Sequence, residues 1–359
     1  MQTLFTKSEK IKLEIEHVLE QFYVEDGHFP LSREFYWHMK KYATSGKLFR
    51  GCFLSEMYTT LQSSRADQMA VHSENALLRI AAGLELICSG LLVHDDIMDH
   101  DARRRGLLTT HTTMADWAET QEFALPTEFG ESAALCFGDV LFFLGSDCFS
   151  QAEVPAEVKV QLQHVSNHEL MLLGLAQAED LRLANMQIEA VSEDEIIKMQ
   201  YGKTGRYTGR WPLVLAATLV GVSAQQTEKL GRIGDELGLL YQWRDDYLGL
   251  FGDPQKTGKN VVSDIQEGKK TLYYWHAWHS LEGAEKQVIE SAFGNPHVSV
   301  DAVSQVLDIL ENSGVVDRIE EKIDTQIEKT KERIHKANLP DAAEELLLGV
   351  VELIVKREK

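Results

Sequence analysis

The stretch ALLRIAAGLELICSGLLVHDDIMDHDARRRG, residues 76–106, leads from a nearly all-apolar segment into four aspartates and three consecutive arginines. Its first part is apolar on every side of a helix, which is typical of a helix at the centre of a bundle. If residues 76–99 form one helix, Asp95 and Asp99 lie one turn apart and share a face. Carboxylates at the mouth of an apolar bundle are unfavourable without a counter-ion, so this helix end is predicted to hold a cation.

Helical periodicity also dominates the rest of the chain, and sustained two-residue alternation is scarce. No change in composition separates two regions, and no short repeat is visible. The predicted fold is all-α, a single domain over residues 1–359 built as a helical bundle with a central apolar cavity. We expect the other helices over residues 10–22, 130–151, 155–186, 192–220, 223–251, 270–293, 300–336 and 342–359.

Composition narrows the class of protein. The 36 basic and 56 acidic residues give a formal net charge of −20, which disfavours binding to nucleic acid or anionic lipid. No secretory signal is visible, and the uncharged stretch of residues 211–227 is too short to span a bilayer. We therefore expect a cytoplasmic protein without stable membrane insertion. Its scattered cysteines are expected to be reduced thiols, namely Cys52, Cys88, Cys136 and Cys148.

A second acidic cluster lies in QWRDDYLGLFGD, residues 242–253, where Asp245 and Asp246 end another apolar helical stretch. Oxygen ligands suit Mg²⁺, which uses one or two carboxylates and leaves other positions to water and phosphate oxygens. Basic residues with neighbouring glycines accompany both clusters: Lys47, Arg50, Arg103, Arg104, Arg105, Lys203, Arg206, Lys256, Lys259, Lys269 and Lys270. Carboxylate-bound metal facing Lys and Arg groups would clamp a diphosphate ester with an apolar tail. The alternative is that both clusters are solvated helix ends with surface ion pairs.

Together these segments resemble the trans-isoprenyl diphosphate synthases, the polyprenyl synthetase family. HDDIMDHDARRRG is similar to the family's first aspartate-rich motif, and further motifs follow in the family's order: GKLFR (46–50), GDVLFF (138–143), GLAQAEDL (174–181), GKTGRYT (202–208), YQWRDDYLGLFGDP (241–254) and DIQEGKKTL (264–272). The resemblance implies an isoprenoid synthase-type bundle, a homodimer and a Mg²⁺-dependent prenyltransferase. This enzyme would condense isopentenyl diphosphate with an allylic diphosphate, head to tail.

The resemblance also implies roles for single residues. Asp95 and Asp99 would bind two Mg²⁺ ions, Asp245 would bind a third, and Asp96 and Asp246 would support them. The allylic diphosphate would contact Arg104, Lys203, Lys259 and Lys269, whereas isopentenyl diphosphate would contact Lys47, Arg50 and Arg105. Thr204 and Gln242 would line the reacting centre. Of these residues, Asp95, Asp99, Asp245, Lys203 and Lys259 are the predicted catalytic set.

The chain departs from the family's pattern at three positions. Cys88 stands where the family usually has His or Gln as an isopentenyl diphosphate contact, and a thiol is a weak hydrogen-bond donor. Gly249 replaces the last aspartate of the second motif, which raises the question of whether Asp253 compensates. Gly90 stands where a bulky aromatic tends to limit the product to farnesyl length. An open position of one helical turn, about 5.4 Å, favours geranylgeranyl diphosphate.

Several alternatives stay open at this point. Gly90 could instead allow close helix packing, with Phe142 or Phe143 closing the tunnel, and the product could be farnesyl or a longer diphosphate. A class I terpene cyclase would share the first motif, but its second metal motif is not found in this sequence. A non-catalytic partner subunit would keep the fold and lose aspartates, whereas both acidic clusters are retained here.

Overall fold

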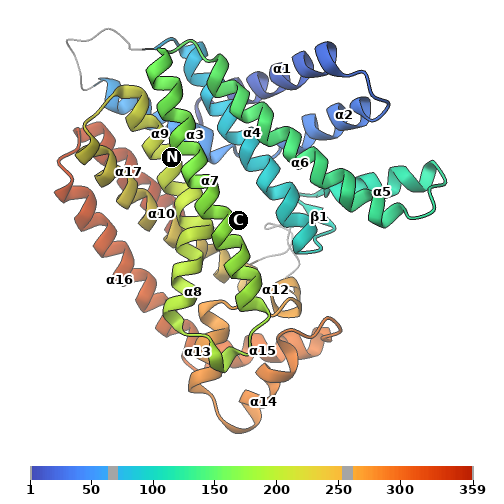
Figure 1. Cartoon of the computed structure of the whole chain (residues 1–359). Coiled ribbons are helices and arrows are strands. Elements are labelled where there is room, and N and C mark those ends of the chain that lie inside the picture. The colour runs from blue at the N-terminus through green and yellow to red at the C-terminus, as the bar shows by residue number, and fades with distance from the viewer. Residues whose placement is uncertain (1, 64–71, 253–261, 358–359) are drawn as a thin grey trace. The chain divides into compact units, whose positions relative to one another are not determined.

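The structure of the chain is a computed structural model, and it describes residues 2–63, 72–252 and 262–357 (Figure 1). Nearly all of the regular structure in these ranges is helical, which confirms the predicted all-α class. The chain packs as two compact units, residues 1–165 with 215–223 and residues 166–214 with 224–359. The single domain and the central cavity stay predictions, and each unit is described by itself below.

Unit 1 contains the N-terminal helices. These are η1 (Gln2–Phe5), α1 (Ser8–Asp26), α2 (Ser32–Ala43), α3 (Phe49–Ser63), α4 (Glu74–Met98), α5 (Thr110–Thr120), α6 (Pro126–Gln151), the start of α7 (Ala156–Ala184) and the end of α9 (Trp211–Val220). The centre of this unit is α4, because most of its side chains are buried on all sides, as the apolar run predicts. The helix begins at Ser73, whose hydroxyl oxygen accepts a hydrogen bond from the Ala76 amide at 3.1 Å.

Helices α4 and α6 run side by side through paired glycines (Figure 1). A Cβ atom on Gly83 would lie 2.7 Å from the Gly145 carbonyl oxygen, and one on Gly90 would lie 2.8 Å from that of Gly138. The two glycines of each helix are seven residues apart and therefore share one face. Both helices are long and apolar enough to cross a membrane, yet 83% of the apolar window of α4 is buried inside the protein.

Unit 2 contains the rest of α7 and the C-terminal helices. These are η2 (Ile188–Ala190), α8 (Glu193–Gln200), η3 (Tyr201–Arg210), the start of α9, α10 (Ala224–Phe251), α12 (Val262–Gln266), α13 (Leu272–Ser280), α14 (Gly283–Ala292), α15 (Val300–Asn312), α16 (Val315–Lys336) and α17 (Asp341–Val355). The segment η3 is a π-helix, and its backbone packs directly on α10. This contact needs glycine, because a Cβ atom on Gly209 would lie 1.9 Å from the Gly234 carbonyl oxygen.

Three predicted helical stretches differ from the structure. Residues 270–293 form two helices, α13 and α14, and the second begins at Gly283, whose φ angle is 60°. Residues 300–336 form α15 and α16, which are separated at Gly314 with a φ of 75°. Residues 192–220 contain the π-helix between two α-helices. Apolar residues flank the first two breaks on both sides, so the helical pattern alone does not reveal them, whereas Tyr201–Arg210 is rich in glycine and basic residues and has little apolar periodicity.

A small hairpin that periodicity did not predict holds the arginine triplet. Strand β1 (Arg103–Arg104) pairs antiparallel with β2 (Leu107–Leu108), with Arg104 opposite Leu107. The turn residues Arg105 and Gly106 have φ angles of 52° and 79°, which is the signature of a type I′ turn. A turn of this kind reverses the chain within two residues, so Arg103 and Arg104 belong to a strand whereas Arg105 lies in the turn.

Candidate active site

The first aspartate-rich segment forms the C-terminal end of α4. The Asp99 amide donates to the Asp95 carbonyl oxygen at 2.8 Å, so the two residues are one helical turn apart, as predicted. Both side chains are half-buried. The C-terminal end of a helix carries partial negative charge, so carboxylates placed there favour a bound cation. This arrangement fits a hard metal ion that uses carboxylate oxygens and leaves other positions to water or phosphate.

Asp96 is buried beside this pair and has a different environment. Its carboxylate accepts a hydrogen bond from the Tyr42 hydroxyl at 2.7 Å and a short one from Arg104. Burial raises the pKa of Asp96 to about 6, although Arg104 opposes the shift. Arg104 also lies 3.6 Å from Asp95 and 3.3 Å from Asp101. A single guanidinium therefore joins three carboxylates and fixes the hairpin to the end of α4.

The basic residues predicted to bind isopentenyl diphosphate are brought together in unit 1. Arg105 donates to the Ser45 carbonyl oxygen at 2.6 Å, and a Cβ atom on Gly46 would lie 2.8 Å from its guanidinium. Gly46 leads into Lys47, and Arg50 lies in the first turn of α3. The hairpin turn thus places Arg105 against the loop that carries Lys47 and leads into Arg50, more than 50 residues earlier in the chain.

The buried Glu85 stabilises this cluster through the start of α3, and sequence reasoning missed it. Its side chain is 5% exposed, and one carboxylate oxygen accepts from the Gly51 amide at 2.6 Å. It caps α3 from a neighbouring helix, since the first amides of a helix have no partner within the helix. Burial raises the pKa of Glu85, whereas Arg50 lowers it. The signal available in the sequence was one acidic residue inside an apolar run.

Cys88 and Gly90 are two of the positions at which the chain departs from the family's pattern. Cys88 is 1% exposed, and burial raises the pKa of its thiol to about 12, so the sulfur stays protonated. A Cβ atom on Gly90 would lie 2.8 Å from the Gly138 carbonyl oxygen and 2.9 Å from the Phe142 ring. The expectation that Gly90 opens a tunnel is therefore wrong for this position. Its physical role is the close packing of α4 on α6.

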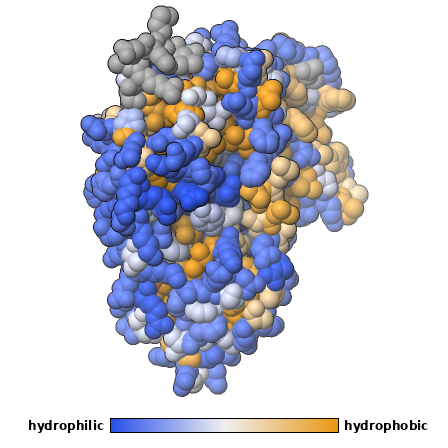
Figure 2. Space-filling view, turned by 60° about the vertical axis from the view of Figure 1, so that its left-hand side comes forward, coloured by the Kyte–Doolittle hydropathy of each residue, from blue (hydrophilic) through white to orange (hydrophobic). Residues whose placement is uncertain are grey.

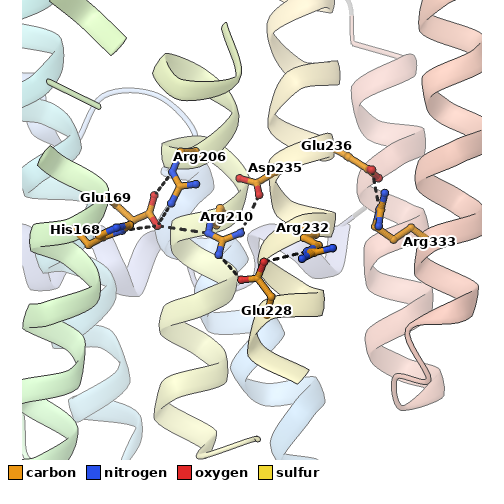
Figure 3. Close-up of polar contacts among 9 residues, drawn as sticks. All are labelled: His168, Glu169, Arg206, Arg210, Glu228, Arg232, Asp235, Glu236 and Arg333. Carbon is orange, nitrogen blue, oxygen red and sulfur yellow. Dashed lines mark hydrogen bonds and ion pairs between the residues drawn. The ribbon is translucent and has the colours of Figure 1, made fainter. Parts of the chain in front are cut away.

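In unit 2, buried ion pairs hold the π-helix η3 (Figure 3). Arg206 donates to both carboxylate oxygens of Glu169 on α7, at 2.8 and 2.7 Å. Arg210 lies 2.9 Å from Asp235 and 2.6 Å from Glu228, both on α10. Glu169 and Asp235 are only 4% and 2% exposed. A segment with three glycines is a poor helix former, so these pairs are needed to fix its backbone.

A chain of hydrogen bonds starts in η3 and ends in the second acidic motif. The Thr204 hydroxyl donates to the Gln242 side-chain oxygen at 2.5 Å, and the Gln242 amide donates to Asp246 at 2.6 Å. Gln200 donates to the other Asp246 oxygen at 2.7 Å and accepts from the Trp243 indole at 3.0 Å. The chain joins three predicted residues directly, and Gln200, which sequence reasoning missed, holds the Asp246 end of it. Burial raises the pKa of Asp246 to about 7.

The other predicted residues of unit 2 are held in ion pairs. Lys203 donates to Asp180 at 2.7 Å. Asp245 lies 3.0 Å from Arg357, near the end of the described chain. Lys269 lies 3.5 Å from Asp264 and 3.0 Å from Glu267. The predicted Lys259, together with Asp253 and Lys256, lies outside the described residues.

Within the described ranges, no three His, Cys, Asp or Glu side chains are grouped closely enough to hold a metal by themselves. The acidic groups occur in smaller sets, Asp95 with Asp99 in unit 1 and Asp245 in unit 2. Such sets suit an ion that takes one or two protein carboxylates and completes its coordination with water and phosphate. The residues present therefore fit Mg²⁺ bound together with a diphosphate, rather than a metal enclosed by protein ligands.

Comparisons with known proteins agree with this chemistry. Residues 33–310 match the polyprenyl synthetase family. A geranylgeranyl pyrophosphate synthase of Geoglobus acetivorans is 30% identical over 257 residues, 72% of this chain and 73% of that protein. A short chain isoprenyl diphosphate synthase of Methanocaldococcus jannaschii is 30% identical over 237 residues, 66% of each protein.

Solved structures show the same fold. A geranylgeranyl pyrophosphate synthase of Corynebacterium glutamicum, complexed with isoprenyl diphosphate and magnesium, superimposes with a TM-score of 0.89 at 24% identity. The match covers 99% of both chains. The chain described here therefore belongs to the polyprenyl synthetase family and is a prenyltransferase of the prenyl diphosphate synthase class, as its ordered motifs predicted.

Proposed function

We propose that this protein condenses isopentenyl diphosphate head to tail with allylic diphosphates, and that geranylgeranyl diphosphate is its main product. The observation that carries the proposal is the end of α4, where Asp95 and Asp99 share one face beside the cluster of Lys47, Arg50 and Arg105. Metal-binding carboxylates next to separate cations suit two diphosphates, whereas a terpene cyclase binds one. Names of relatives support the product class, since several are geranylgeranyl diphosphate synthases.

The reaction begins when the allylic carbon–oxygen bond breaks, which leaves a delocalised cation on carbon and negative charge on diphosphate. Bound Mg²⁺, held by Asp95, Asp99 and Asp245, would neutralise that charge. Lys203 and Arg104 would bind the same anion from fixed positions. The double bond of isopentenyl diphosphate then attacks the cation, and the new cation loses a proton to the departed diphosphate. Three ions per site is the number that we propose.

Residues of η3 and α10 would position the reacting carbon. The Thr204 hydroxyl is fixed by its 2.5 Å bond to Gln242, which is itself held by Asp246. Oxygen atoms that are already oriented before the bond breaks would stabilise the carbocation that forms, through their dipoles. Lys47, Arg50 and Arg105 would hold the second substrate, and Cys88 would add only a weak contact at most.

We also propose that the active form is a cytoplasmic homodimer. Large apolar side chains are exposed along α6 and α7, and hydrophobic patches interrupt the hydrophilic surface seen in Figure 2. The most exposed of them are Leu135, Phe143, Val160, Met171 and Leu175. Exposed apolar side chains along two helices that are consecutive in the chain favour a partner, and a second copy is the simplest one.

Product analysis tests the proposal directly. Purified protein is incubated with Mg²⁺, isopentenyl diphosphate and each allylic starter, and products are identified by mass spectrometry. A linear prenyl diphosphate of twenty carbons is expected. A cyclised hydrocarbon would indicate a cyclase, and no product would indicate a non-catalytic partner subunit. Asp95→Asn should abolish the product, whereas Asp116→Asn, at an exposed position of α5, should not change it.

A further inference from the structure

Tyr42 is a buried residue of α2 whose hydroxyl group reaches the first aspartate-rich segment. It lies outside the segments that resemble the family's motifs, because the nearest of them begins at Gly46. Tyr42 is 3% exposed, and its hydroxyl donates to the Asp96 Oδ2 atom at 2.7 Å. A tyrosine hydroxyl in the interior needs a partner, and a buried carboxylate needs donors. The contact satisfies both groups, so each fixes the orientation of the other.

Asp96 is held from two sides by residues that are far apart in the chain. Tyr42 bonds one carboxylate oxygen, and the Arg104 guanidinium bonds the other. The Asp96 side chain is fully buried, so bulk solvent does not reach it. Loss of one donor would leave that oxygen unsatisfied and the carboxylate free to turn about its Cβ–Cγ bond. The position of Arg104 therefore depends on the Tyr42 hydroxyl.

The backbone of the same tyrosine reaches Arg105 through Ser45. The Tyr42 carbonyl oxygen accepts from the Ser45 hydroxyl at 2.6 Å and from the Ser45 amide at 3.2 Å. The Ser45 carbonyl oxygen in turn accepts from Arg105 at 2.6 Å. Since Arg104 and Arg105 are consecutive residues, these contacts close into one network. The Tyr42 network consists of Tyr42, Ser45, Asp96, Arg104 and Arg105.

The aromatic ring of Tyr42 is itself fixed by its neighbours. The ring of His38, one turn earlier on α2, lies 5.8 Å from that of Tyr42. The His38 Nε2 atom lies 3.0 Å from the hydroxyl of Thr110, a fully buried residue that begins α5. Packing of this kind locks a rotamer and holds a functional group within about 0.5 Å of its working position. Tyr42 therefore has the rigid support that a positioning residue needs.

We propose that Tyr42 is a positioning residue, which fixes the arginine hairpin and, through Arg105, sets the affinity for isopentenyl diphosphate. The inference deepens the proposed function and rests on it, because Arg105 is assigned there to isopentenyl diphosphate. A merely structural tyrosine would satisfy the buried carboxylate and do no more. Its loss would then lower the free energy of unfolding and leave the affinity of the folded protein unchanged.

The test measures the Kd of the full-length protein for isopentenyl diphosphate by isothermal titration calorimetry, without turnover. Tyr42→Phe keeps the aromatic ring, removes the hydroxyl and should raise this Kd about tenfold. Tyr36→Phe is the matched control on the same helix and should leave the Kd unchanged, because the Tyr36 ring stacks on Tyr23 at 4.9 Å. Circular dichroism confirms that each variant is folded.

A double-mutant cycle separates positioning from stability. If Tyr42 acts through Arg105, Tyr42→Phe should raise the Kd by less than about twofold once Arg105→Gln has removed that contact. Ser45→Ala opens the Tyr42 network at a half-buried position and should raise the Kd about threefold. This variant decides the question if Tyr42→Phe does not fold.

An unchanged Kd in folded Tyr42→Phe, or the same loss of affinity with and without Arg105, overturns the inference. Where Tyr42→Phe is unfolded, an unchanged Kd in Ser45→Ala overturns it. If the wild type binds isopentenyl diphosphate and forms product in such a case, only the role of Tyr42 fails. If the wild type neither binds isopentenyl diphosphate nor forms product with any starter, the proposed function itself fails.

Discussion

Replacing Glu169 by Gln should destabilise unit 2 by an amount that can be worked from the ion pairs of η3 (Figure 3). Glu169 is 4% exposed and binds Arg206 through both oxygens, with Arg210 at 3.6 Å as a third contact. Gln keeps the shape and one acceptor, but its amide group would face an arginine donor. Removing one partner of a buried pair destabilises a protein by about 3–5 kcal/mol.

The lower end of that range is expected, about 3 kcal/mol, because two features reduce the loss. Arg210 keeps Asp235 and Glu228 as partners, and the Arg206 side chain is 16% exposed. Arg232→Gln is the control, since Arg232 is 62% exposed and bonds only to Glu228 in Figure 3. An exposed pair of this kind contributes about 0–1 kcal/mol.

Urea unfolding followed by circular dichroism gives the free energy of unfolding of each variant. Hydrogen exchange of the η3 amides locates the loss, which should appear in Tyr201–Arg210 first. The double variant Glu169→Gln/Arg206→Met should be more stable than Glu169→Gln, because it removes the uncompensated charge. The reasoning is refuted if Glu169→Gln and Arg232→Gln differ by less than about 1 kcal/mol, since that would place the pair among exposed ones.

Three further outcomes are expected. Gly90→Ala should lower the free energy of unfolding by about 1–3 kcal/mol, because the added Cβ atom would meet the Gly138 backbone. Gly174→Ala is the control and should raise the free energy of unfolding by about 0.5–1 kcal/mol, because the space around Gly174 is open. Equal effects of the two substitutions in thermal or urea unfolding would contradict the packing role of Gly90. Asp246 keeps its proton up to about pH 7 in the folded protein and up to about pH 4 when unfolded, so the stability of the metal-free protein should fall as pH rises through this window, by up to about 4 kcal/mol from this group. Asp246→Asn should flatten that slope in urea titrations at several pH values, and an unchanged slope would assign it to other groups. Glu85→Ala should destabilise α3 by about 1–3 kcal/mol and raise the KM for isopentenyl diphosphate about tenfold, because the Gly51 amide loses its acceptor; an unchanged KM in steady-state assays would separate Glu85 from the Arg50 site.

The sequence by itself determined the all-α class, the shared face of Asp95 and Asp99, and the family. These features depend on local periodicity or on the order of motifs along the chain, and neither requires knowledge of how distant helices pack. It also identified Thr204, Gln242 and Asp246, which the structure joins in one chain of hydrogen bonds.

Only the tertiary structure decided which residue of a distant helix each helix face contacts. Gly90 faces Gly138 on another helix, and Gly249 meets the carboxylate of Asp264. A glycine has no side chain whose character could reveal its neighbour, so sequence reasoning could not distinguish an open tunnel from close packing. The Glu85 carboxylate caps the start of α3, which lies more than 30 residues earlier in the chain. Helical periodicity tells which residues share a face, but the contact across that face depends on how distant helices pack.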